Sequence, residues 1–369
     1  MHIDSPESAS IIRRLFCFYM LIFLPVFHNE RVKEKVMKVD FSKIEINSKY
    51  VYSLDPKVLK ILLKDKTTKK NIIWATDEYA NLGTGYSATD EIYPSDIEGI
   101  ASIITPRVAK SRESQATRIR GMAEVFTPSW VCNKQNNLID CAWFGRNDVF
   151  NAEIANGWQT IDAKIDFPDA KGKSWQDYVK ANRLEISCGE APYLTSRYDA
   201  VSGEMIPVKN RIGFLDRKLR VVSENAGSEK EWYSWAKKAV QSVYGYDLQG
   251  DNVLLARENL LFTFIEHYED KFDVPPIPEY LIEIAKILAW NIFQMDGIKF
   301  IVPGSCRNKT VKTETLFGVE TTEEKCIGCR TNDNGKHNGI YCRTYDWVAN
   351  ESVEFYSTFI RGKKRNGKL

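Results

Sequence analysis

Three short apolar segments between residues 183 and 297 each end in a residue suited to binding a ligand, and helical stretches separate them. Residues 183–187 run into Gly189, residues 243–247 end in Asp247, and residues 291–297 carry Asp296 at their exit. Strands that alternate with helices form a largely parallel sheet covered by helices. The pattern therefore predicts a doubly wound α/β fold, which is the strongest constraint that the chain offers.

The helices between these segments follow from the spacing of their apolar residues. Residues 229–240 repeat apolar side chains at helical intervals, and Asp251 is expected to cap a second helix with a long apolar inner face. A third helix follows the prolines at 275, 276 and 278 and runs through residues 281–288. Ligands of such a sheet bind beyond the carboxyl ends of its strands. We therefore expect Gly189, Asp247 and Asp296 to lie at one edge, although each alone is a commonplace end for a strand.

A further segment resembles a known cofactor motif. Residues 123–128, Ala-Glu-Val-Phe-Thr-Pro, resemble the Phe-Thr-Pro motif of the N6-adenine DNA methyltransferases of restriction–modification systems. Residues 246–257 are similar to that family's second-strand acid and its following helix, and residues 291–297 are similar to its third element. The resemblance covers residues 37–339 and points to the branch called restriction endonuclease subunit M. It implies a Rossmann-like fold that binds S-adenosylmethionine (SAM).

The same resemblance implies roles for individual residues. Gly189 would leave room for the methionine part of SAM, Asp247 would accept from the ribose hydroxyls, and Asp296 would lie near the adenine amine. Glu185 or Glu190 would face the methionine ammonium. The cofactor-binding residues implied in this way are Phe126, Thr127, Pro128, Glu185, Gly189, Asp247 and Asp296.

Two departures from the family pattern bear on activity. The separation between Gly189 and Asp247 is roughly double the usual one, which indicates an inserted element. The chain also has no Asn-Pro-Pro-Tyr or Asp-Pro-Pro-Tyr segment, the turn that grips the flipped target base in this family. Glu190, Pro192 and Tyr193 keep part of that pattern and are the candidate catalytic residues.

We therefore expect a SAM-dependent, adenine-specific DNA methyltransferase-like subunit of a restriction–modification or phage-defence system. The partners expected are DNA and a specificity, restriction or second methyltransferase subunit that completes the catalytic motif. An alternative is a non-catalytic subunit that keeps the fold for DNA binding or assembly. A second alternative is a zinc-dependent nucleic-acid-binding protein.

That second alternative depends on a cysteine group late in the chain. Cys326 and Cys329 form a Cys-x-x-Cys pair that His337 and Cys342 follow, with Cys306 upstream as an alternative ligand. These are the ligand types of a tetrahedral zinc site. Unpaired thiols in a turn, or a redox pair, are the other readings. The eight cysteines do not form the pattern of a small secreted disulfide scaffold, which favours a reduced, cytoplasmic compartment.

The ends of the chain differ from its middle. Arg13 and Arg14 precede an apolar run at 15–27 that is short for a bilayer, so residues 1–36 are read as a leader, a packed helix, or sequence upstream of a true start at Met37. No stable membrane partner is expected. An N-terminal α+β region is predicted at 37–120, the SAM-binding core at 121–300, a Cys/His-rich knuckle at 301–347 and a basic tail at 348–369. The net charge is only +2, so contact with phosphates would need a local basic surface such as that tail, which is otherwise a solvated end.

Overall fold

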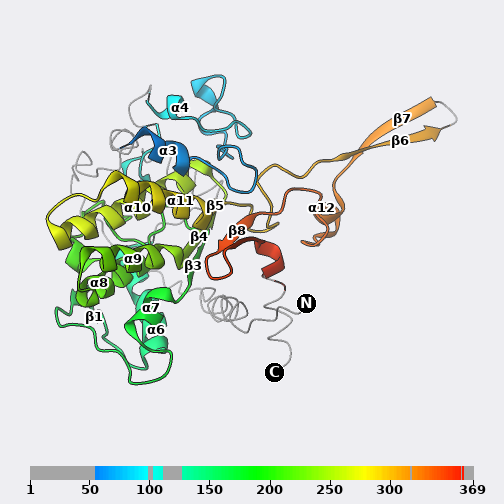
Figure 1. Cartoon of the computed structure of the whole chain (residues 1–369). Helices are drawn as coiled ribbons and strands as arrows, with labels where there is room; N and C mark the ends of the chain where they lie inside the picture. Colours follow the sequence, from blue (N-terminus) through cyan, green and yellow to red (C-terminus); the bar gives the residue numbers. More distant parts are fainter. Residues whose placement is uncertain (1–54, 99–102, 111–126, 316–317, 359, 361–369) are drawn as a thin grey trace.

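A three-stranded parallel sheet lies near the middle of the molecule (Figure 1). The computed structural model describes residues 55–98, 103–110, 127–315, 318–358 and 360. Phe126, the predicted leader at 1–36 with Met37, and the basic residues from Arg361 onward lie outside the described residues. The expectations for them therefore stay predictions.

Pairs of helices separate the strands in the middle of the chain, and strands predominate after residue 292. The described helices are α3 (Pro56–Leu62), α4 (Pro94–Glu98), α6 (Ser129–Phe144), α7 (Trp175–Lys180), α8 (Phe214–Asn225), α9 (Glu229–Gln241), α10 (Gly250–Phe272), α11 (Pro278–Asn291) and α12 (Ile327–Thr331), with 3-10 turns η2 (Ala80–Leu82), η3 (Arg107–Ala109) and η4 (Val208–Asn210). The strands are β1 (Asn151–Ile154), β2 (Gly157–Thr160), β3 (Arg183–Ile186), β4 (Val243–Asp247), β5 (Ile292–Gln294), β6 (Lys309–Thr315), β7 (Gly318–Glu324), β8 (Arg343–Asp346) and β9 (Glu351–Glu354).

The central sheet has the order β3-β4-β5, with both neighbouring pairs parallel. Helices α8 and α9 connect β3 to β4, and α10 and α11 connect β4 to β5. The three strands predicted from the sequence are therefore confirmed, as is the mixed α/β class. The other described sheets are antiparallel strand pairs: β1-β2, β6-β7 and β8-β9.

The two faces of the sheet bury different cores, because alternate side chains of a strand point to opposite faces. Val243 and Ile292 join the large core formed with the helices. Leu184, Tyr244 and Phe293 belong to a second cluster, which residues of the C-terminal part complete. In the described residues, helices α8 to α11 thus cover one face, and aromatic residues of the segment after β5 cover the other.

Helix α9 illustrates why the sequence forms these elements. The Ser228 side chain accepts a hydrogen bond from the Glu231 amide and so caps the helix. Trp232, Ala236 and Val240 lie on one face and are fully buried. The apolar spacing read from the sequence therefore predicts this helix correctly.

The start of α10 differs from the prediction. Gln249, not Asp251, is the N-cap residue. The Asp251 carboxylate is fully buried, lies 3.1 Å from Lys110 Nζ and accepts a hydrogen bond from the Tyr79 hydroxyl at 2.7 Å. A buried carboxylate needs charged or donating partners, and these come from distant parts of the chain. The predicted capping role of Asp251 is therefore wrong.

Residues 71–75, in the N-terminal region predicted as α+β, form no regular strand. Only isolated bridges form there, between Asn71 and Lys64 and between Ile73 and Glu91. The Gln294 side chain accepts from the Ile73 amide at 2.9 Å and donates to its carbonyl oxygen at 2.8 Å. One glutamine side chain thus takes the place of a neighbouring strand and ties the N-terminal region to β5.

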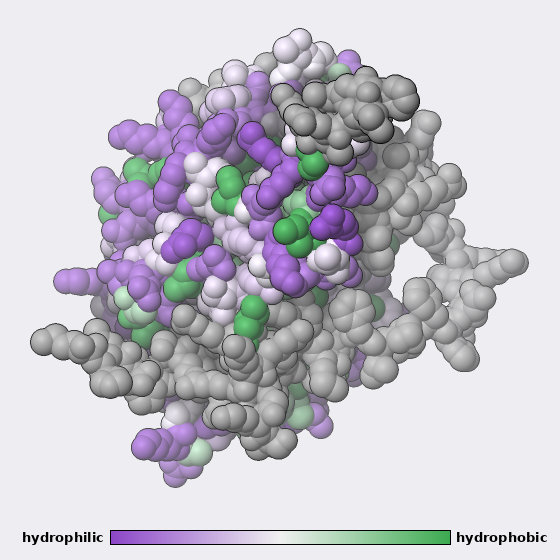
Figure 2. Space-filling model, turned by 90° about the vertical axis from the view of Figure 1, so that its right-hand side faces the viewer, coloured by the Kyte–Doolittle hydropathy of each residue, from purple (hydrophilic) through white to green (hydrophobic). Residues whose placement is uncertain are grey.

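The C-terminal part carries a projecting hairpin, the β6–β7 arm, formed by residues 309–324 (Figure 1). On the side of the molecule that Figure 2 presents, hydrophilic residues dominate the described surface and hydrophobic residues form small separate groups. Among the residues that the structure describes, no helix has both the length and the apolar character required to cross a bilayer.

Candidate functional site

The turn after β3 has an unusual backbone. Ser187, Gly189 and Ala191 all have positive φ, at 46°, 51° and 63°. Residues other than glycine adopt such angles rarely, and strained positions of this kind are found at ligand-binding turns as well as in ordinary turns. At Gly189 an added Cβ would meet no atom of the described residues within 4 Å, so that part of the structure leaves space beside the turn.

The carboxylate of Asp247 holds this turn. Its Oδ2 accepts a hydrogen bond from the Gly189 amide at 2.9 Å. Its Oδ1 accepts from the Gln249 amide at 3.0 Å and from Asn252 Nδ2 at 3.3 Å. Gly189 and Asp247, which the sequence places at the ends of two separate strands, are therefore in direct contact.

The third predicted residue, Asp296, lies at the neighbouring strand end. The amide of Met295 donates to the Asp247 carbonyl oxygen at 2.9 Å, so the chain passes directly beside β4 before it reaches Asp296. The Asp296 carboxylate accepts from the amides of Ile298 and Lys299, each at 3.1 Å, and lies 3.1 Å from Lys299 Nζ. The three strand ends are adjacent, but this carboxylate stabilises its own turn.

Glu185 supports the glycine turn from below. It is buried, and its carboxyl group accepts from the amides of Tyr193 at 3.4 Å and Leu194 at 3.2 Å. Burial raises the pKa of Glu185 well above its ordinary value, and these two backbone N–H groups oppose the shift. The side chain thus contacts the loop after the turn, rather than the open space beside Gly189 that the expected ammonium contact requires.

The candidate catalytic residues after the turn contact neighbouring side chains. The Tyr193 hydroxyl hydrogen bonds with the side chains of Thr127 and Cys132, and burial raises the pKa of this hydroxyl. Glu190 accepts a hydrogen bond from the Tyr198 hydroxyl. These contacts hold Glu190 and Tyr193 within the fold, on either side of Pro192. They also bring Thr127, from the Phe-Thr-Pro segment, beside the turn after β3.

Helix α6 begins immediately after that segment. Pro128 is its N-cap residue, and the Ser129 amide donates to the Asp199 carboxylate at 2.8 Å. A carboxylate at a helix N-terminus satisfies an otherwise unpaired amide and complements the helix dipole. Asp199 thus joins the inserted segment after β3 to the residues that follow the Phe-Thr-Pro motif, a role that the sequence alone did not indicate.

A separate group of side chains lies at the base of the β6–β7 arm. The sulfur atoms of Cys306, Cys326 and Cys329 and a ring nitrogen of His337 all lie within 4.8 Å of one another. Cys306 precedes β6 and Cys326 follows β7, so the group joins the two ends of the arm. These four residues form a group that could hold a metal ion.

Four of the six distances within this group match those of a tetrahedral centre. The Nδ1 atom of His337 is 3.5 Å from the Cys306 sulfur, 3.6 Å from Cys326 and 3.7 Å from Cys329. The sulfur atoms of Cys306 and Cys326 are 3.5 Å apart. Ligands at about 2.0–2.3 Å from one central ion would be separated by about 3.5–3.8 Å. One imidazole nitrogen cannot form good hydrogen bonds with three thiols at once, so the arrangement suits four ligands of one ion better than a hydrogen-bonded network.

The pKa values of the thiols reflect the same crowding. Burial and the neighbouring thiols of Cys326 and Cys329 raise the pKa of Cys306 to about 12. Burial also opposes ionisation of Cys326, but the backbone N–H groups of Asn338 and Cys329 and the His337 ring lower its pKa to about 6. The Cys326 thiol therefore ionises readily and the Cys306 thiol does not, because adjacent thiolates repel one another unless a cation lies between them.

Cys342 is not a member of this group, which corrects the predicted ligand set. It is fully buried in the second core, and its thiol donates to the Gln294 carbonyl oxygen at 3.3 Å. Cys306, the alternative ligand, takes its place. The sequence favoured Cys342 because it is nearer along the chain, whereas the β6–β7 arm brings Cys306 back to the knuckle.

Two residues that the sequence did not single out shape the knuckle. A Cβ on Gly328 would lie 2.6 Å from His337 Nδ1, so only glycine allows the ring to lie so close. The Tyr341 hydroxyl accepts from the His337 amide at 3.1 Å and donates to the Asn334 carbonyl oxygen at 2.6 Å. Together they fix the position of the histidine ligand.

Comparisons of the chain with protein-family models, with curated proteins and with solved structures found no match.

Proposed function

We propose that the chain binds SAM at the carboxyl ends of β3, β4 and β5 and acts as an adenine-specific DNA methyltransferase-like subunit. In this proposal the three parallel strands are one half of a doubly wound, Rossmann-like sheet. A restriction–modification or phage-defence system is its proposed setting. DNA and a further subunit are its proposed partners.

The observation that carries the proposal is the hydrogen bond of 2.9 Å from the Gly189 amide to the Asp247 carboxylate. It joins a side-chain-free turn and an acid at the ends of two adjacent parallel strands, which is where sheets of this class bind nucleoside-containing ligands. The open space at Gly189 and the nearby Thr127 also support it.

Each residue then has a distinct task. SAM, when bound, supplies an electrophilic methyl group on a sulfonium centre. Gly189 leaves room for the methionine part, and Asp247 keeps the turn in place while it faces the ribose side of the site. Thr127 and Pro128 form the adjoining wall. Asp296 lies at the next strand end, where its turn borders the same edge.

Equilibrium dialysis of the full chain against radiolabelled SAM tests the proposal. We expect saturable binding of one SAM per chain, and we expect S-adenosylhomocysteine to displace it, because the two molecules share the adenosine and amino-acid parts. ATP shares only the adenosine and is the control competitor. Absence of saturable SAM binding, or equal displacement by ATP, contradicts the proposal.

A second candidate function is supported by one feature of the sequence. The Asn-Pro-Pro-Tyr and Asp-Pro-Pro-Tyr turns are absent from the chain, and Glu190 and Tyr193 contact Tyr198 and Thr127. A subunit that binds SAM and DNA but depends on a partner for catalysis fits these facts. Methylation of adenine in DNA by the purified chain alone would rule out this candidate.

We also propose that the ion held by Cys306, Cys326, Cys329 and His337 is a structural zinc. Three thiolates and one imidazole leave no open position in a tetrahedron, which is the pattern of structural rather than catalytic zinc. Elemental analysis of the purified chain tests this, with one zinc per chain as the expected result. A chain that carries iron, or no metal after purification without chelators, contradicts it.

A further inference from the structure

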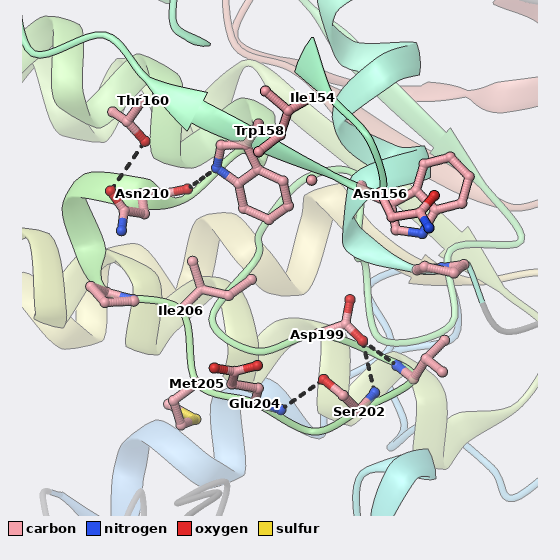
Figure 3. A pocket seen from close by; sticks show the side chains of 15 residues that line it. Ile154, Asn156, Trp158, Thr160, Asp199, Ser202, Glu204, Met205, Ile206 and Asn210 are labelled. Carbon is pink, nitrogen blue, oxygen red and sulfur yellow. Dashed lines mark hydrogen bonds between the residues drawn. The ribbon is translucent and has the colours of Figure 1, made fainter. Parts of the chain in front are cut away.

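An open pocket of about 650 Å³ lies between the β1–β2 hairpin, the start of α6 and the loop at 199–207. Figure 3 shows Trp158 and Ile154 of the hairpin above Asp199, Ser202 and Glu204 of the loop. The hydrogen bond from Ser129 to Asp199 joins two walls of the pocket, and Pro128 contributes to its lining. The pocket therefore borders the end of the Phe-Thr-Pro segment.

Apolar side chains are unusually exposed in this pocket. Ile154 is 58% exposed, Val201 48% and Met205 36%, and all three line it. Trp158 lies among them with its orientation fixed, because its Nε1 donates to the Asn210 carbonyl oxygen at 2.8 Å. With that polar atom satisfied, Trp158 offers a ligand its aromatic surface. Large apolar side chains gathered in a hollow mark a binding site.

The charges of the pocket restrict the ligand further. Asp199 and Glu204 line it, and the described residues of its lining include no lysine, arginine or histidine. Burial opposes ionisation of Asp199, but the amides of Ser129, Ser202 and Val201 outweigh burial and lower its pKa below the ordinary value. The carboxylate is therefore charged at neutral pH. A phosphate or carboxylate inside the pocket would be repelled.

Two lysines lie beside the residues that line the pocket. Lys134 is exposed, and its Nζ lies 6.0 Å from the centre of the Trp130 ring, which also lines the pocket. Lys209 is exposed and directly precedes the lining residue Asn210. A ligand with a flat, uncharged part and phosphates outside that part complements this arrangement.

We propose that this pocket holds one unpaired base of a DNA strand, stacked on Trp158, with its exocyclic amine donating to the Glu204 carboxylate. The inference rests on the proposed function, since it assumes that the partner is DNA. Base stacking on an aromatic side chain is a general means of holding single-stranded DNA, and carboxylates accept hydrogen bonds from base amines. Adenine and cytosine carry an amine, whereas thymine does not. The lysines at the margin contact the flanking phosphates.

Fluorescence anisotropy with short labelled single strands of dA, dC or dT and the full chain tests the inference. We expect dA and dC strands to bind about tenfold more tightly than dT strands at equal salt. Trp158→Leu should weaken binding of all three by about tenfold. Glu204→Gln should reduce the preference over dT to threefold or less. Glu351→Gln, which changes an exposed carboxylate elsewhere by the same charge, should change neither quantity.

Three results would overturn the inference. One is equal binding of dA, dC and dT strands, and another is a Glu204→Gln variant that keeps the full preference. The third is a Trp158→Leu variant that unfolds at the wild-type temperature and binds all strands as the wild type does. Glu204 is exposed, so its variant is informative even if Trp158→Leu does not fold. A preference for dA and dC over dT without SAM binding would refute only the SAM proposal. SAM binding without that preference would refute only the base-pocket proposal.

Discussion

The Gly189 amide and the Asp247 carboxylate, 58 positions apart in the chain, are joined by a hydrogen bond of 2.9 Å. This contact fastens the turn after β3 to the end of β4. It also fixes Gly189 in its left-handed conformation next to open space. The proposed SAM site depends on this pair more than on any other described contact.

Asp247→Ala should lower the free energy of unfolding by about 2–4 kcal/mol, because three donors lose a charged, largely buried acceptor. Asp296→Ala is the matched control, since its carboxylate is more exposed and supports only its own turn; its expected cost is about 1 kcal/mol or less. Urea unfolding of both variants measures the difference. Equal losses for the two would show that Asp247 does not hold the turn.

Glu185 should make stability depend on pH. Its folded-state pKa lies well above the ordinary 4.5, so its stabilising contribution is complete below about that pH and is lost as pH rises through the folded value. Glu185→Gln removes this loss of stability with pH. It keeps only one acceptor oxygen, whereas Tyr193 and Leu194 donate to separate oxygens of Glu185, so the variant also carries a constant cost at every pH. The variant should therefore gain stability relative to the wild type between pH 5 and pH 8. Urea unfolding at both values measures this, and a constant difference would contradict the prediction.

The variants Cys306→Ser and Cys342→Ser should distinguish a metal ligand from a cysteine of the apolar core. Cys306→Ser should release the metal during dialysis, because it removes one of four ligands. Cys342→Ser should retain one metal per chain but unfold at a lower temperature, because its hydroxyl would replace a thiol in an apolar cluster. Elemental analysis and thermal unfolding provide the two readouts. Metal loss in Cys342→Ser with retention in Cys306→Ser would reverse the assignment.

Removal of the metal should loosen the β6–β7 arm while the central sheet stays intact. A two-stranded hairpin is marginally stable by itself, and the proposed ion joins its two ends. Hydrogen exchange after chelation should therefore lose protection at Val311 and Thr313. Amides of α10 should keep theirs. Unchanged protection in the arm would mean that other contacts order it.

The sequence predicted those parts of the fold whose signals are local. Strands β3, β4 and β5 were found because apolar runs end in turn-forming or acidic residues, and α9 because its buried residues repeat at helical spacing. Asp251 was misassigned because a capping residue and a buried ion-pair partner look alike until Lys110 and Tyr79 are placed beside it. The distinction depends on contacts between distant segments.

For the candidate sites, too, the sequence predicted what local signals encode and missed what depends on contacts between distant segments. The Cys-x-x-Cys pair and His337 identified the metal group, but the choice between Cys306 and Cys342 depended on the path of the β6–β7 arm. The pocket at Trp158 had no local signal, because a hairpin, a helix start and a loop contribute its walls. Its lining residues are brought together by tertiary contacts such as the hydrogen bond from the Ser129 amide to Asp199, which no local pattern predicts.

Calorimetric titration of SAM into Gly189→Ala and Gly172→Ala tests the central claim most directly. Both glycines have positive φ, and no atom in the described part of the chain lies within 4 Å of an added Cβ at either, so the two variants carry similar backbone strain. Only the methyl group at residue 189 would enter the proposed methionine site. We predict that Gly172→Ala binds SAM as the wild type does and that Gly189→Ala binds at least about tenfold more weakly. Equal affinity for SAM in both variants would contradict a cofactor site at this turn.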